Sequence, residues 1–328
     1  MNTKTRIGIC GYGNLGRGVE SEISRNPDME LVAVFTRRKP VESLKIKANV
    51  PVVHIDSAPE WKEKIDVMIL CGGSKNDLPT QGPRFAKDFN TVDSFDTHAK
   101  IPEHFEAVDL VSKAAKKISI ISIGWDPGLF SLQRLYAGAI LPDGKTYTFW
   151  GEGVSQGHSE AIRNLEGVDD AIQYTIPDKA VMERIRSGET PELTAREKHK
   201  RECYVVLAGA PDKERIENEI KSMPDYFADY DTTVHFIDKG RLRAEHGKLK
   251  HGGNVIHLGK TGDGANQVVE FSLKLDSNPE FTASVLLAYA RAAHRLSARG
   301  ESGARTIFDI PPALLSPSPP EELRRTLL

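Results

Sequence analysis

Short apolar runs separated by polar, glycine-containing segments dominate the first 125 residues. Runs at residues 5–10, 31–35, 52–55, 66–71, 91–95 and 118–123 have the length and composition of buried strands. Helix-like stretches lie between them at residues 15–25, 59–64, 77–88 and 102–117. Strands that alternate with helices at this spacing predict a parallel sheet with helices on both faces, a doubly wound α/β fold of the Rossmann type.

The pattern changes after Trp125. Runs rich in β-branched and aromatic residues predict strands at residues 146–151, 202–207, 232–237, 254–258 and 267–275, with helices at 179–186 and 212–222. This mixture predicts an α+β domain with a mixed or antiparallel sheet. Residues 280–299 predict an amphipathic helix that returns to pack on the first domain, and the proline-rich segment 311–320 is expected to be irregular.

Two domains are expected, because 328 residues are too many for one ordinary core. The predicted dinucleotide-binding domain comprises residues 1–125 together with 280–328. Residues 126–279 are the predicted substrate-binding and dimerisation domain.

Composition narrows the class of protein. Hydrophobic residues make up 39% of the chain, charged residues 27%, and the net charge is -2, which predicts a soluble protein without a nucleic-acid or membrane partner. No apolar run approaches the ~20 residues that cross a bilayer, and the N-terminus lacks the apolar core of a signal peptide. Three widely separated cysteines favour a reducing compartment. We therefore expect a cytoplasmic protein.

A glycine-rich turn joins the first predicted strand to the first predicted helix. Its sequence is Gly11-Tyr12-Gly13-Asn14-Leu15-Gly16. In dinucleotide-binding folds the first glycine permits the turn, the second lets a pyrophosphate approach the backbone, and the third lets helix and strand pack closely. The position of the motif predicts a dinucleotide site rather than a turn that only packs.

The end of the second predicted strand indicates which dinucleotide binds. NAD enzymes place a carboxylate there for the ribose 2′-hydroxyl, but this strand ends in Thr36-Arg37-Arg38. A hydroxyl and two guanidinium groups suit a 2′-phosphate, so NADP is the expected cofactor. The segment Cys71-Gly72-Gly73-Ser74 ends the strand predicted at residues 66–71, where small residues either let the cofactor lie across the sheet edge or simply end the strand. His98 is expected beside the cofactor as well.

Polar residues gather in three further segments, at 93–98, 124–128 and 149–158. The first two follow predicted parallel strands, where ligands of open α/β sheets bind. Asp96 and Asp126 would suit a substrate with an ammonium group, or they are turn and cap residues.

At this point the chain resembles the meso-diaminopimelate dehydrogenase family over nearly its whole length. The resemblance rests on GYGNLGRGVE from Gly11, FTRR from Phe35, TVDSFDTH from Thr91, GWDPGLFS from Gly124, TFWGEGVSQGHS from Thr148, HKREC from His199, MPDYF from Met223, HGGNVI from His251 and LKLDSNPEFTAS from Leu273. It implies NADP-dependent, reversible oxidative deamination of the D-configured centre of meso-2,6-diaminopimelate. The products are ammonia and L-2-amino-6-oxopimelate, which cyclises to tetrahydrodipicolinate, a precursor of lysine. It also implies a homodimer.

The resemblance also implies roles for individual residues. The carboxylates at the reacting centre fall on Asp96 and Asp126, beside Trp125, and which of the two is the acid–base residue is left open. A loop over the substrate falls on Gln156, Gly157 and His158. The remaining pocket residues are Phe149, Thr175, Arg201, His251 and Asn278, of which Arg201 can hold a carboxylate with two hydrogen bonds.

Three alternatives remain. One is another NADPH-dependent reductase of the same pathway. A semialdehyde dehydrogenase is the second, and it would need an activated cysteine in the second domain, where only Cys203 lies. The third is an NADPH-binding sensor without turnover. No metal is expected, because His199 and Cys203, and the histidines near His251, do not have the spacing of zinc ligands.

Overall fold

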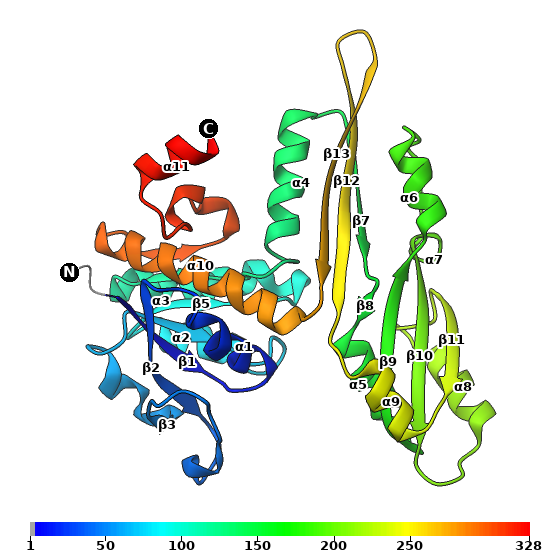
Figure 1. Cartoon of the computed structure of the whole chain (residues 1–328), viewed down its shortest axis with the longest axis horizontal. Helices are drawn as coiled ribbons and strands as arrows, with labels where there is room; N and C mark the ends of the chain where they lie inside the picture. Colours follow the sequence, from blue (N-terminus) through cyan, green and yellow to red (C-terminus); the bar gives the residue numbers. More distant parts are fainter. Residues whose placement is uncertain (1–3) are drawn as a thin grey trace. The chain divides into compact units, whose positions relative to one another are not determined.

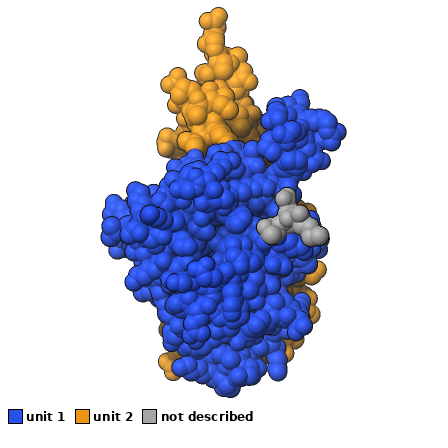
Figure 2. Space-filling model, turned by 90° about the vertical axis from the view of Figure 1, so that its left-hand side faces the viewer, with its two compact units in different colours: residues 1–132, 279–328 blue, residues 133–278 orange. Residues whose placement is uncertain are grey.

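The structure is a computed structural model and describes residues 4–328. It divides into two compact units, which Figure 2 distinguishes by colour. Unit 1 takes the chain up to residue 132 and again from residue 279 to the end, and unit 2 comprises residues 133–278. Each unit is built around its own sheets, and Figure 1 labels most of their strands.

Unit 1 is built on a sheet whose neighbouring strands are all parallel. Its strands are β1 (Thr5–Cys10), β2 (Met29–Thr36), β3 (Val52–His54), β4 (Val67–Leu70), β5 (Asn90–Asp93), β6 (Ile118–Ile120) and β14 (Gly303–Arg305). Within the described residues they lie in the order β14-β6-β5-β4-β1-β2-β3. The order reverses between β1 and β4, and ligands of doubly wound folds bind at such a point. The predicted Rossmann-type fold is confirmed, and the three-residue β14 is an addition.

Most α-helices of unit 1 lie between these strands in the sequence, and α11 follows the last of them. The helices are α1 (Asn14–Ile23), α2 (Leu78–Phe85), α3 (Ile101–Ala115), α10 (Asn278–Ala298) and α11 (Pro320–Leu327), while α4 (Leu129–Ile140) begins in unit 1 and ends in unit 2. The short 3-10 helices are η1 (Val41–Ser43), η2 (Ile55–Trp61), η3 (His98–Lys100), η4 (Ile307–Asp309) and η5 (Pro312–Leu314). The helix-like stretch expected at residues 59–64 is not an α-helix: residues 59–61 end the 3-10 helix η2, which contains Pro59, and residues 62–64 form a turn. Residues 311–320, expected to be irregular, contain η5.

Successive buried residues of the strands pack on opposite faces of the sheet. On β1, Ile7 and Ile9 join the hydrophobic cluster that also contains residues of α1 and α10. Cys10 belongs to a second cluster, with Leu78 and Phe85 of α2. This alternation follows from the two-residue period of a strand, and it explains why the strands read as continuous apolar runs in a sheet covered on both faces.

Arg291 joins α10 to the beginning of the fold. Its side chain is 4% exposed, and its Nε donates to Asp28 Oδ2 at 2.6 Å. Further bonds run to the side chain of Asn26 and to the carbonyl oxygen of Leu315. The guanidinium holds the pKa of the Asp28 carboxyl below its usual range. One side chain thus connects the turn before β2, helix α10 and the C-terminal segment.

Unit 2 contains two sheets where one was expected. The first is antiparallel, in the order β13 (Ala265–Leu275), β12 (His251–Thr261) and β7 (Lys145–Trp150). The second has the order β11 (Asp231–Phe236), β10 (His199–Leu207), β9 (Val168–Pro177) and β8 (Gly153–Val154), and it is mixed because β10 and β11 run parallel. The helices of the unit are α5 (Gln156–Arg163), α6 (Lys179–Arg186), α7 (Ala195–Lys198), α8 (Lys213–Ser222) and α9 (Lys239–His246).

Replacing the buried arginine tests what holds α10 in place. R291M removes the guanidinium and leaves the Asp28 carboxylate without its cation, so we expect a loss of about 3 kcal/mol in the free energy of unfolding at pH 7. The pair of Arg25, whose side chain is 77% exposed, with Glu22 supplies a matched control, and R25A should cost less than about 1 kcal/mol.

The pH dependence of stability provides a second test of the Arg291–Asp28 ion pair. A carboxyl with a lowered pKa contributes stability above its unfolded pKa of about 3.9, and that contribution is lost as the pH falls below it. Urea unfolding should therefore show the difference between wild type and R291M shrinking from pH 7 to pH 3. A difference that is constant over this range would contradict a role for the ion pair.

Candidate functional site

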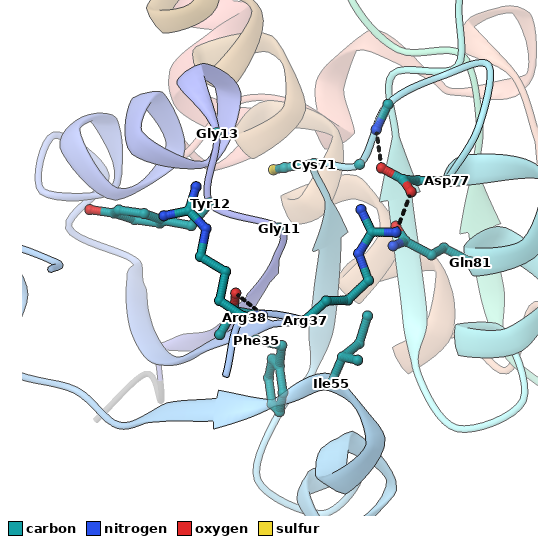
Figure 3. Close-up of a pocket in the computed structure, with 13 residues that line it drawn as sticks. Gly11, Tyr12, Gly13, Phe35, Arg37, Arg38, Ile55, Cys71, Asp77 and Gln81 are labelled. Carbon is teal, nitrogen blue, oxygen red and sulfur yellow. Dashed lines mark hydrogen bonds and ion pairs between the residues drawn. The ribbon is translucent and has the colours of Figure 1, made fainter. Parts of the chain in front are cut away.

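A cavity of about 300 Å³ opens in unit 1 at the carboxyl ends of β1, β2 and β4 (Figure 3). The residues that line it are Gly11, Tyr12, Gly13, Phe35, Thr36, Arg37, Arg38, Ile55, Cys71, Gly72, Gly73, Asp77 and Gln81. Nine of the predicted cofactor residues are thus brought together in one place. Asn14, Leu15 and Gly16 are the first three residues of α1, directly beyond the turn.

The three glycines of the turn differ in what constrains them. Gly11 has φ +94°, and a side chain there would contact the backbone of Cys71. A Cβ on Gly16 would lie 2.2 Å from the carbonyl oxygen of Gly11, so close packing of helix and strand excludes any other residue. A Cβ on Gly13 would meet no protein atom within 4 Å. The protein leaves the space beside Gly13 open, at the N-terminus of α1, where a helix attracts phosphate.

Cationic side chains occupy one part of the cavity. Thr36 ends β2, and its hydroxyl accepts a hydrogen bond from the backbone N–H of Arg38 at 3.1 Å. Arg37 forms an ion pair with Asp77, with Nη1 and Oδ1 2.8 Å apart. Figure 3 shows the Arg37 and Arg38 side chains extending from the end of β2, with Arg37 directed to Asp77 and Arg38 toward Tyr12. A hydroxyl and two guanidinium groups at the end of β2 fit a phosphate on the ribose better than a free 2′-hydroxyl.

The sequence did not single out four residues of the cavity wall, namely Phe35, Ile55, Asp77 and Gln81. Asp77 is the most informative of them. Besides pairing with Arg37, its Oδ2 accepts a bond from the backbone N–H of Gly73 at 2.9 Å. Asp77 therefore fixes both the loop after β4 and the direction of Arg37. Its position just before α2 is the one feature of the sequence that could have pointed to it.

Ser74, Asp96 and His98 do not line this cavity. The hydroxyl oxygen of Ser74 accepts bonds from the backbone N–H groups of Asp96, at 2.8 Å, and Thr97, at 3.2 Å. This joins the loop after β4 to the loop after β5. The side chains of Asp96 and His98 are exposed.

Trp125 and Asp126 lie in the turn that leads from the end of β6 into α4. Trp125 is 8% exposed and packs its ring edge-on against Phe130, with centroids 5.2 Å apart. Gly128 has φ +130°, and a Cβ on it would lie 1.9 Å from the carbonyl oxygen of Gly124, so the turn is closed tightly. Since β5 and β6 are neighbours, Asp96 and Asp126 follow adjacent strands at the same edge of the sheet.

In unit 2, Thr175 on β9 stands opposite Arg201 on β10. Both are buried, and an Nη of Arg201 donates a hydrogen bond to the Thr175 hydroxyl. The guanidinium lies 4.0 Å from the centre of the Tyr230 ring. Burial lowers the pKa of Arg201, but an arginine remains charged at neutral pH. A buried cation without a carboxylate partner among its described bonds suits an anionic ligand.

The expected loop at Gln156, Gly157 and His158 was wrong. These residues form the first turn of α5, which begins after Ser155. The hydroxyl of Ser155 and Nδ1 of His158 are 2.7 Å apart, so the turn is held by its own side chains. The loop was expected from the family resemblance, whereas in this structure the segment is helical. Burial lowers the pKa of His158 to about 4, so its ring is neutral at pH 7.

The remaining expected pocket residues have different environments. Phe149 is 0% exposed and belongs to a hydrophobic cluster with Ile256, so its ring supports the sheet. His251 begins β12, its Nδ1 lies 2.8 Å from the backbone N–H of Gly252, and burial lowers its pKa. Asn278 begins α10, and its backbone N–H donates to the carbonyl of Leu249 at 3.0 Å.

His199 is a buried histidine to which the sequence assigned no role in the pocket. It is 3% exposed, and its Nε2 accepts a hydrogen bond from the backbone N–H of Trp150 at 2.9 Å. Burial, reinforced by the charge of Arg201, lowers the pKa of His199 to about 3. A neutral ring two residues before Arg201 therefore supports the strand without adding a second cation.

The cysteines are not activated. All three are free, and burial raises the pKa of Cys10 and of Cys203 to about 12 and that of Cys71 above its ordinary value. They are thiols at neutral pH, which argues against the semialdehyde dehydrogenase alternative.

Among residues 4–328, no group of three or more His, Cys, Asp and Glu side chains is arranged to hold a metal ion. No helix in the described part of the chain is long and apolar enough to span a membrane.

The buried neutral histidine predicts an acid-dependent loss of stability. A histidine with a pKa of about 3 in the folded state and about 6.5 when unfolded contributes stability above pH 6.5, and the contribution is lost as the pH falls. Between pH 7.5 and pH 5 this amounts to roughly 2 kcal/mol. H199Q, whose amide oxygen can still accept from Trp150, should lose that much less than wild type in urea unfolding. The exposed H98Q should behave like wild type, and equal losses in all three proteins would contradict the interpretation.

Comparison with known proteins identifies the family of the chain. Residues 124–277 match the family model for the diaminopimelic acid dehydrogenase C-terminal domain. The chain is 61% identical to the meso-diaminopimelate D-dehydrogenase of Ureibacillus thermosphaericus, over 99% of this chain and 100% of that protein.

Solved structures of similar proteins support the same family. A mutated meso-diaminopimelate dehydrogenase from Clostridium tetani E88, crystallised with DAP, has a TM-score of 0.94 at 56% identity and covers 99% of this chain and 100% of that one. An engineered D-amino acid dehydrogenase bound to NADP⁺ has a TM-score of 0.87 at 44% identity, with the same coverage. The chain belongs to the meso-diaminopimelate D-dehydrogenase family.

Proposed function

We propose that the protein is an NADP-dependent meso-diaminopimelate D-dehydrogenase. The reaction is the reversible oxidative deamination of the D-configured amino centre of meso-2,6-diaminopimelate. It yields ammonia and L-2-amino-6-oxopimelate, which cyclises to tetrahydrodipicolinate on the route to lysine. The observation that carries the proposal is the glycine-lined cavity with Arg37 and Arg38 at its wall, in a chain of this family.

The cavity residues fit the proposed cofactor. The open backbone at Gly13 would receive the pyrophosphate, and Thr36, Arg37 and Arg38 would hold the 2′-phosphate. Cys71, Gly72 and Gly73 leave room beside it, and Ser74 and His98 belong to the loops further along the same edge. Bound NADP⁺ supplies a nicotinamide ring that accepts hydride.

Asp96 and Asp126 are the proposed catalytic residues. Two carboxylates that follow adjacent strands can hold the substrate's ammonium group, and one of them takes the proton that must leave before hydride transfer. Trp125 fixes the turn that carries Asp126 by packing against Phe130. The contribution of the protein is therefore to position the amino centre and to match its charge.

Residues of unit 2 are proposed to bind the rest of the substrate. Arg201 would hold a carboxylate of the distal L-configured centre, helped by Thr175 and His251. Gln156, Gly157 and His158, in the first turn of α5, and Asn278 would complete the binding surface. The neutral rings of His158 and His199 leave Arg201 as the cation for that carboxylate.

The domain roles follow from these assignments. We propose that residues 1–125 with 280–328 bind the dinucleotide and that residues 126–279 bind the substrate and form a homodimer. The compact units of the structure divide a few residues later, after Leu132, and return at Pro279. The enzyme is proposed to work in the cytoplasm.

The direct test is NADP⁺ reduction by the purified chain with meso-diaminopimelate, followed at 340 nm, beside the L,L-isomer and beside NAD⁺. We expect turnover with the meso isomer and NADP⁺, and at least 100-fold less with the L,L-isomer, which lacks a D-centre. Tight NADPH binding without turnover of any isomer would favour the sensor alternative. Equal rates with both isomers would contradict the proposed stereochemistry.

A substitution at Asp96 tests its chemical role. The residue is anchored through its backbone N–H to Ser74, so D96A leaves that anchor in place. We expect kcat to fall by about 10²–10⁴-fold, because a carboxylate that holds and deprotonates the ammonium is lost, while the Kd for NADPH changes less than about threefold. E106A removes an exposed carboxylate on α3 and should leave both values unchanged. Loss of NADPH binding in D96A would indicate a structural role instead.

A further inference from the structure

Asp93 is a buried carboxylate to which the proposed reaction assigns no role. It is the last residue of β5, three positions before Asp96, and it is 2% exposed. Burying a carboxylate is costly unless every oxygen has partners. Its partners therefore show what the residue does.

One oxygen of Asp93 joins two loops. Oδ1 accepts hydrogen bonds from the backbone N–H of Phe95, at 3.0 Å, and from that of Ser122, at 2.9 Å. The carbonyl oxygen of Asp93 also accepts a bond from the backbone N–H of Ile123, at 2.8 Å. Phe95 directly precedes Asp96, while Ser122 and Ile123 lead into the turn that carries Asp126. A single residue thus ties together the two segments that bear the proposed catalytic carboxylates.

The other oxygen of Asp93 is held by His104 on α3. Oδ2 lies 2.9 Å from Nε2 of His104, and both side chains are 2% exposed. The imidazole stacks on the ring of Phe95, with centroids 4.2 Å apart and planes 19° from parallel. His104 therefore fixes Asp93 by a hydrogen bond and the start of the Asp96 loop by packing.

The backbone conformation of Ser122 indicates that the bond to Asp93, rather than local preference, holds this segment in place. Its φ is +57°, a left-handed conformation that residues other than glycine rarely adopt. Its hydroxyl is buried without a protein partner, so its bonding to Asp93 runs through the backbone N–H. The bond from that N–H to Asp93 favours the left-handed conformation and with it the path of the chain toward Asp126.

We propose that Asp93, oriented by His104, is a positioning residue that sets the two loops carrying Asp96 and Asp126. The inference rests on the proposed function of those two carboxylates. Its physical basis is that hydride and proton transfer require the reacting atoms within a few tenths of an ångström, and a displacement of about 1 Å costs about 100-fold in rate. Asp93 contacts backbone and His104 rather than substrate, so it acts through the loops.

The experiment compares D93A with D93N in the full-length protein. D93A removes the acceptor of both loop N–H groups, so we expect kcat to fall about 100-fold, while the Kd for NADPH changes less than about threefold. The primary isotope effect on kcat with substrate deuterated at the D-centre should rise, because hydride transfer becomes limiting. D93N keeps an amide oxygen that can accept the same two bonds and should retain at least a third of the wild-type kcat.

Thr91 supplies the matched control. Its hydroxyl donates to that of Ser119 at 2.8 Å, a buried bond between the same two strands, β5 and β6, but upstream of both loops. T91V should keep kcat within about twofold of wild type. If D93A does not fold, H104F replaces it, since phenylalanine can keep the stacking on Phe95 but cannot bond Asp93, and kcat should fall about tenfold.

Each outcome decides between the possibilities. A wild-type kcat in D93A or in H104F overturns the inference, and so does a fall in T91V equal to that in D93A, because the effect would then be general packing. A D93N as inactive as D93A also overturns it, since the charge rather than the position of the acceptor would matter. Failure of the wild type to oxidise meso-diaminopimelate would refute the proposed function itself.

Discussion

The arrangement of the candidate site depends on backbone hydrogen bonding between parallel strands at the edge where they end. The backbone N–H of Gly11 donates to the carbonyl of Phe35 at 2.9 Å, and that of Cys71 donates to the carbonyl of Cys10 at 2.7 Å. These bonds continue the sheet one residue beyond β1 and β4, so the loops after β1, β2 and β4 start together. In a parallel sheet such loops all lie at one edge, and the cavity exists because the strand order reverses there.

The charged side chains at this edge of the sheet determine which ligands it can bind. Arg37 and Arg38 extend from the end of β2, and Asp77 directs one of them while holding the loop after β4. Further along the edge, Asp96 and Asp126 follow β5 and β6, and buried Asp93 ties their loops. Cationic groups at one part of the edge and anionic groups at another are what a phosphorylated cofactor and an ammonium-bearing substrate require of one protein.

Much of unit 1 could be predicted from the sequence, because most of its strands lie in compact apolar runs and Gly11 to Gly16 stand directly between a strand and a helix, whereas the short β14 has no such pattern. The site residues that were missed belong to no such motif, and the one local signal for Asp77 is its position before a helix. Asp77 and Asp93 matter for which backbone groups they accept from, and those partners lie on other loops. In unit 2, β9 was missed although its residues alternate in burial, because Asp169, Asp170 and Gln173 interrupt the apolar pattern. Gln173 is buried, as the two-residue period of the strand requires, but it is polar where the pattern predicts an apolar residue.

The most direct test is the affinity of the purified chain for NADP⁺ and NAD⁺, measured by titration calorimetry at one fixed salt concentration. Charge-assisted bonds contribute roughly 1.5–3 kcal/mol each, so two arginines on the 2′-phosphate predict NADP⁺ binding at least about 100-fold tighter. Equal dissociation constants for the two dinucleotides would contradict the assignment of the cavity beside Arg37 and Arg38.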